Sequence, residues 1–118
     1  MTKVPVELEH YDLSLENRRR TRNEVVGAAA RAMLADHGWG ESQWRCLNLL
    51  WEGESAWRHT AENQSSGAYG IPQSLPGSKM ADVAPDWRTN AETQITWGLA
   101  YIAARYDNPQ GAWGHSQR

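Results

Sequence analysis

Several features that define other classes of protein are missing from this chain. One of its 118 residues is cysteine, so an intrachain disulfide is excluded. It has no apolar run near the roughly 18 residues that a membrane-spanning helix needs, and residues 1–5 lack the apolar core of a secretory signal. Its net charge of −2 offers no general attraction to nucleic acid or to an anionic membrane. We therefore expect one domain that neither spans a membrane nor binds nucleic acid.

Side chains that bind metals or carry redox chemistry are few and scattered. No two histidines stand four residues apart, the spacing that places two zinc ligands on one helix face; they are His10, His37, His59 and His115. We expect no metal site and no cofactor. Cys46 shares one side of a predicted helix with Leu49 and Gly53, so we expect a buried thiol that acts as a small apolar side chain.

The aromatic composition is unusual, because phenylalanine is absent while there are seven tryptophans and four tyrosines. Trp and Tyr combine an apolar ring with a polar atom, which suits surfaces that are half apolar and half wet. Clefts that bind sugars are such surfaces, since pyranose rings present CH faces and hydroxyls together. The alternative interpretation is that the tryptophans fill the core of a small domain.

The chain divides into a short N-terminal region and one domain. Residues 1–21 are predicted to form an extended arm and the start of a helix, and residues 22–118 to form the domain. The first helix is predicted over about 14–37. A capping-box pattern at 21–24 would instead start the main helix near residue 22, and Gly38 ends it.

The remaining pattern predicts a mainly α fold around a central helix. That helix is expected at 41–54 and another at 90–106, followed by a short final turn that carries Trp113. Residues 58–88 lack strong periodicity and are rich in glycine and proline, which is typical of a functional loop. A small β-hairpin at 67–73 is an alternative to an irregular loop there.

Glu54 is the strongest candidate for a chemical role. At about 100° per residue, it shares one helix stripe with Leu47, Leu50 and Trp51, whereas Glu52 faces the opposite, polar side. A carboxyl in an apolar pocket at a helix C-terminus has a raised pKa and can serve as a general acid at neutral pH. The alternative is a partly exposed acid at a frayed helix end.

Several short motifs resemble lytic transglycosylases of the soluble, goose-lysozyme-like type, in the version found in actinobacteria and in the tail proteins of their phages. The similarity covers about residues 43–116, and its motifs lie at 54–57, 67–73, 86–90, 94–102 and 112–116. Two positions depart from the family pattern. Pro72 stands where the family more often has methionine, and Trp113 stands where it often has a tyrosine that lines the cleft.

The resemblance implies a lysozyme-like α+β fold and cleavage of the MurNAc–GlcNAc bond of peptidoglycan. Glu54 would protonate the leaving oxygen, and the carboxylate would then take a proton from the sugar's C6 hydroxyl, which closes into an anhydro product. No water attacks, so no second carboxylate is needed. The residues expected to bind substrate in or near the cleft are Asn63, Ser66, Tyr69, Gln73 and Trp113. For Gln73, the alternative is a side chain that only satisfies loop backbone groups.

Other functions remain open on these residues. A hydrolysing lysozyme could use Glu62 or Asp82 as its second carboxylate. A wall-binding or structural module of a phage tail or cell-wall protein could keep the fold without cutting glycan. A third alternative, the resuscitation-factor type of wall enzyme, usually has a disulfide that Cys46 alone cannot supply. We expect a monomer acting on peptidoglycan glycan strands, in the cell wall, outside the cell or on a phage virion.

Overall fold

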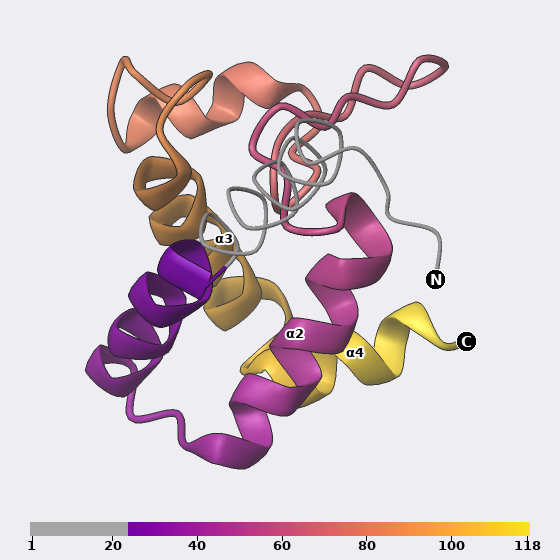
Figure 1. The fold of residues 1–118 in the computed structure, drawn as a ribbon. Coiled ribbons are helices and arrows are strands. Elements are labelled where there is room, and N and C mark those ends of the chain that lie inside the picture. Colours follow the sequence, from indigo (N-terminus) through magenta and orange to yellow (C-terminus); the bar gives the residue numbers. More distant parts are fainter. Residues whose placement is uncertain (1–23) are drawn as a thin grey trace, which may run out of the picture.

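Helices make up most of residues 24–118, the part of the chain that the computed structural model describes (Figure 1). A first helical stretch occupies residues 24–36. The elements after it are the α-helices α2 (Glu41–Ser55), α3 (Ala91–Tyr106) and α4 (Pro109–Ser116) and the 3-10 helix η1 (Gly77–Asp82). The predicted mainly α, single-domain fold is confirmed at this level. The arm and helix start predicted for residues 1–21 lie outside the described residues.

Local sequence explains where these helices begin and end. The Asn90 side chain accepts hydrogen bonds from the backbone N–H groups of Glu92 and Thr93, which caps α3 one residue from the predicted start. Ala56 adopts a left-handed conformation (φ 51°) and donates its N–H to the Glu52 carbonyl, which ends α2. The prediction of 41–54 for α2 is therefore correct to one residue.

The short final turn predicted at the end of the chain is a helix in the structure. Residues 109–116 form the eight-residue helix α4 rather than a short turn. Pro109 occupies its first turn, where a missing N–H costs nothing, and the Asn108 side chain accepts a hydrogen bond from Gly111 N–H. Helix α4 packs against α2, behind which it crosses in Figure 1, and also contacts α3.

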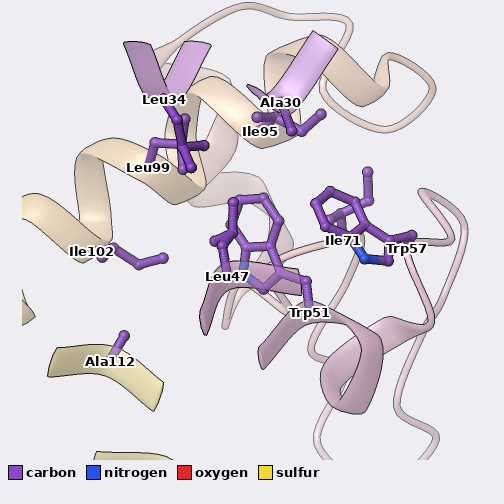
Figure 2. Packing of buried hydrophobic residues seen from close by; sticks show 10 residues of the cluster. All are labelled: Ala30, Leu34, Leu47, Trp51, Trp57, Ile71, Ile95, Leu99, Ile102 and Ala112. Carbon is purple, nitrogen blue, oxygen red and sulfur yellow. The ribbon is translucent and has the colours of Figure 1, made fainter. Parts of the chain in front are cut away.

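One hydrophobic core joins the α-helices. Figure 2 shows Leu47 and Trp51 of α2 below Ile95 and Leu99 of α3, with Ile71 of the loop beside them. The other buried members of the core are Ala30, Leu34, Trp57, Ile102 and Ala112. Trp51 and Trp57 therefore fill part of the core, as the alternative interpretation of the composition held, and Trp39 and Trp44 pack against it.

The Trp51 ring of α2 reaches the backbone of α3 because Gly98 has no side chain. A Cβ atom at this position would lie 2.6 Å from Trp51 Cζ2 and 3.0 Å from Pro72 Cβ, which is closer than real contacts allow. Gly98 thus lets the Trp51 ring and the loop residue Pro72 pack directly on the backbone of α3.

Residues 56–76 form an irregular loop over the C-terminal end of α2, rather than a regular hairpin. Tyr69 makes isolated antiparallel bridges to Glu62 and to Ser74. Of the two forms expected at 67–73, the irregular loop is therefore the one observed. Gly67 and Gly70, at φ 82° and 80°, turn the chain there.

The prediction that the Cys46 thiol is buried is not correct. Leu49 is 52% exposed and Gly53 is exposed, so Cys46 on that side is only half-buried. No helix within residues 24–118 is long and apolar enough to cross a membrane.

Candidate active site

A cavity of about 380 Å³ opens beside the C-terminal half of α2, and it is called the Glu54 cavity here. Its volume lies in the range usual for small-ligand sites. It is bounded by α2, the end of the loop, α3 and α4. The apolar part of its wall consists of Leu50, Trp51, Pro72, Gly98, Ile102 and Ala112. The polar part consists of Glu54, Gln73, Tyr101, Tyr106, His115 and Ser116.

Glu54 stands in the last turn of α2, at the edge of this cavity. The predicted stripe is correct for Leu47 and Trp51, which are buried, but Glu54 itself keeps an exposed surface. The difference arises because the stripe runs out of the core at the helix end and meets the open cavity. The partial burial that remains raises the pKa of the Glu54 carboxyl above its ordinary value of 4.5. A larger share of Glu54 is therefore protonated near neutral pH than of an ordinary glutamate.

The loop beside Glu54 is held by side chains from two helices. Ser55 Oγ of α2 lies 2.8 Å from the Ile71 carbonyl oxygen, and Ile71 N–H donates to Gln94 Oε1 of α3 at 2.9 Å. Both backbone polar groups of Ile71 are thereby paired across the core. Because Pro72 and Gln73 follow directly, the wall of the cavity opposite α4 has a fixed position relative to Glu54.

Gln94 is the central residue of this arrangement. It is fully buried, and its Nε2 donates to the carbonyls of His59 at 3.0 Å and Trp87 at 2.8 Å. Together with the bond from Ile71, these contacts use both donor hydrogens and the acceptor of the amide. The sequence contained a signal for this residue, since Gln94 opens one of the family-like motifs, but sequence analysis assigned it no role.

Gln73 lines the Glu54 cavity and also supports the loop. Its backbone is left-handed (φ 54°), and its Nε2 donates to the carbonyls of Ala61 at 3.1 Å and Gly70 at 2.9 Å. The alternative interpretation, in which this side chain satisfies loop backbone groups, is therefore correct for its amide nitrogen. Both Nε2 hydrogens are used, so only Oε1 remains to accept a hydrogen bond from a ligand.

Tyr69 and Trp113 do not line this cavity, contrary to expectation. Tyr69 is buried on another side of the loop, where its hydroxyl donates to the Arg88 carbonyl at 2.8 Å and its ring meets Trp87 edge-on. Trp113 is half-buried, and α4 instead turns His115 and Ser116 toward the cavity. Because α4 is a full helix rather than a turn, adjacent positions point about 100° apart.

Asn63 and Ser66 form the tip of the loop and are likewise absent from the cavity wall. Asn63 Oδ1 accepts hydrogen bonds from the N–H groups of Ser65 and Ser66, both at 3.0 Å, and from Ser65 Oγ at 2.8 Å. Ser66 Oγ in turn accepts from Ala68 N–H at 3.2 Å. Both side chains shape the turn by pairing with nearby backbone, as Asn and Ser commonly do.

Four polar residues of the cavity wall were not predicted from the sequence as site residues: Tyr101, Tyr106, His115 and Ser116. Tyr101 lies within the motif at 94–102, and Tyr106 lies at the end of the helix predicted at 90–106. Tyr101 could have been recognised from its position three residues after Gly98, on the same side of the helix. The missing side chain of a glycine lets another part of the protein approach the helix on that side. Desolvation, with a smaller contribution from Tyr106, raises the pKa of the Tyr101 phenol, so the group stays a neutral donor.

Among residues 24–118, Glu54 is the sole carboxylic acid in the wall of this cavity. Glu62 and Asp82, the two acids considered as a second carboxylate, do not contribute to it. Within residues 24–118 there is no group of three or more His, Cys, Asp or Glu side chains that could hold a metal ion. The cavity therefore combines one acid of raised pKa, an amide oxygen, two phenols and an imidazole.

No family model, curated protein or solved structure matches this chain. What can be said of its function therefore depends on the Glu54 cavity and on the short motifs that resemble lytic transglycosylases.

Proposed function

We propose that this protein is a peptidoglycan lytic transglycosylase that cleaves the MurNAc–GlcNAc bond with Glu54 as its catalytic acid and base. The observation that carries the proposal is the position of Glu54. Its carboxyl has a raised pKa and stands at the edge of an aromatic-walled cavity of about 380 Å³. A carboxyl of raised pKa keeps its proton to a higher pH and can donate it to a leaving oxygen.

The proposed reaction uses this one carboxyl twice. Glu54 protonates the glycosidic oxygen, and the bond from that oxygen to the anomeric carbon breaks. The Glu54 carboxylate stabilises the positive charge on the sugar and then takes the proton of the C6 hydroxyl. The C6 oxygen bonds to the anomeric carbon, which gives the anhydro sugar and returns Glu54 to its protonated form.

Residues 24–118 contribute no second acid to the cavity wall, which favours this reaction over hydrolysis. A usual glycosidase needs two carboxyl groups about 5–5.5 Å apart for retention or about 6.5–9.5 Å apart for inversion. Among the described residues, none of the other side chains in the cavity wall is such a partner for Glu54, whereas an intramolecular hydroxyl needs none. Gln73 Oε1 is suited to accept the N–H of an acetamido group on the bound sugar.

The lysozyme-like form of the fold belongs to the same proposal. A central helix that ends at the acid, with a loop packed over its C-terminal end, is what supports it. We further propose that the protein acts as a monomer on glycan strands, in the cell wall, outside the cell or on a phage virion.

The test is product analysis with a matched pair of variants. Glu54→Gln should lower the rate of strand cleavage by about 10²–10⁴-fold, because the general acid is lost while the side-chain volume is kept. Glu52→Gln, in the same helix turn but outside the cavity, should cleave at close to the normal rate. Mass spectrometry of digested peptidoglycan should show anhydro ends with the unmodified protein.

Each other outcome points to one alternative. Reducing ends in place of anhydro ends would indicate a hydrolysing lysozyme and would exclude the intramolecular reaction. Glycan binding without any product would indicate a binding or structural module. Loss of cleavage in Glu52→Gln but not in Glu54→Gln would show that the acid has been assigned to the wrong residue.

A further inference from the structure

A continuous row of aromatic side chains leads out of the Glu54 cavity along α3, and it is called the aromatic ridge here. It consists of Trp97, Tyr101, Tyr106 and His115. Trp97 and Tyr101 are stacked, with ring centroids 5.1 Å apart and planes 12° apart. Tyr101 meets Tyr106 edge-on at 6.2 Å, and Tyr106 meets His115 at 5.1 Å.

The ridge begins inside the cavity and ends outside it. Tyr101, Tyr106 and His115 line the cavity, whereas Trp97 does not. At about 100° per residue, Trp97 and Tyr101 lie one above the other on one flank of α3. Thr96 points to another flank, where its hydroxyl meets Met33 Sδ at 3.8 Å. Trp97 therefore lies on the cavity side of α3, one helix turn farther along.

We propose that the protein binds an extended saccharide chain, in which a sugar beyond those in the Glu54 cavity stacks on the Trp97–Tyr101 pair. The proposal rests on the proposed function only in taking the ligand to be a glycan. It adds a separate binding position outside the cavity, and so it predicts that affinity depends on chain length.

The chemistry of the ridge selects a sugar as its occupant. Its members are all aromatic rings with a polar atom, which match the CH face and the hydroxyls of a pyranose. The large aliphatic side chains that are exposed within residues 24–118 lie elsewhere; they are Val25, Leu49, Leu75 and Val83. Tyr101 is 42% exposed, so its ring remains accessible at the point where the ridge leaves the cavity.

The test measures binding of short and long β-1,4-linked N-acetylglucosamine oligomers by calorimetry, in protein carrying Glu54→Gln so that no chain is cut. Trp97→Ala should weaken binding of the long oligomer by about threefold to tenfold, the usual size of an aromatic stacking contribution, and change binding of the short one by less than about twofold. Trp97→Phe keeps a ring and should restore most of the loss.

Trp39→Ala is the matched control, because Trp39 is also half-buried and stacked, on His37 at 4.4 Å, and lines no part of the Glu54 cavity. It should leave both affinities unchanged. If Trp97→Ala fails to fold, nuclear magnetic resonance of the Glu54→Gln protein replaces it. The indole N–H signal of Trp97 is identified as the one that is missing from Trp97→Phe. The chemical shift of that signal should change when the long oligomer is added, and not with the short one.

Equal loss of both affinities in Trp97→Ala, or no loss of either, would overturn the proposal, as would an indole signal that the long oligomer leaves in place. The result is independent of cleavage. A protein that yields no product but binds long oligomers through Trp97 would refute the proposed reaction and retain the ridge. A protein that cleaves strands with no effect of Trp97 would do the reverse.

Discussion

At the scale of the residue, Glu54 combines a chemical role with a cost in stability. Its carboxyl is partly desolvated at the edge of the cavity, which favours the protonated form and raises its pKa in the folded protein. Because the folded protein then binds this proton more tightly than the unfolded chain does, ionisation of Glu54 lowers stability as the pH rises. The same desolvation supports its use as a general acid.

This linkage predicts how Glu54→Gln affects unfolding. The glutamine variant should be more stable than the normal protein at neutral pH, by less than about 1 kcal/mol because solvent screens the exposed carboxylate. The difference should grow as pH rises from 4.5 through the raised pKa of Glu54 and vanish well below 4.5. Urea unfolding at neutral and at acidic pH measures it, with Glu52→Gln as the control. A gain that is largest in acid would contradict this sign.

At the scale of the element, the loop is held by hydrogen bonds of its own and also by side chains of the neighbouring helices. Tyr69 makes only single β-bridges within it, whereas Ile71 is held from α2 by Ser55 and from α3 by Gln94. Gly70 permits this arrangement, since a Cβ there would lie 2.6 Å from Gln94 Oε1. The placement of the cavity wall thus depends on a buried amide remote from the chemistry.

Replacing that amide should be costly. Gln94→Met keeps most of the side-chain volume but leaves Ile71 N–H and the carbonyls of His59 and Trp87 without their partner. At about 1–3 kcal/mol for each unsatisfied buried group, the free energy of unfolding should fall by about 3 kcal/mol or more. Denaturant unfolding checks this, and Gln64→Met at the exposed loop tip should change it by less than about 0.5 kcal/mol. Equal stabilities would show that the loop does not depend on Gln94.

At the scale of the whole molecule, one core contains residues from every described α-helix. Leu34 from the first helical stretch, Trp51 from α2, Leu99 from α3 and Ala112 from α4 belong to a single buried cluster (Figure 2). The cavity lies at the edge of this cluster, where Trp51, Ile102 and Ala112 contribute to both. The site therefore cannot form unless α2, α3 and α4 are assembled.

We expect such a molecule to unfold in one cooperative step. Far-UV circular dichroism should be helical, and its urea transition should coincide with that of tryptophan fluorescence, because Trp51 and Trp57 report on the same core that holds the helices. A spectrum dominated by β signal would contradict the fold. Two separate transitions would show that the helices do not share one core.

The sequence by itself determined α2 and α3, because apolar periodicity and caps are local. The segment predicted at 41–54 is observed at 41–55, and the Asn90 cap begins the next helix within one residue of expectation. The same periodicity placed Glu54 on the stripe of Leu47 and Trp51. Short-range rules suffice for these features, since each depends on neighbours within about one helix turn.

Only the tertiary structure decided which side chains share the cavity. Tyr69 and Trp113 were expected beside Glu54 and lie elsewhere, whereas Tyr101 and His115 reach the cavity from α3 and α4. These positions depend on how α4 packs against α2 and on the close approach of the Trp51 ring and Pro72 to Gly98. Such packing joins residues far apart in the chain, so periodicity within one segment carries no information about it.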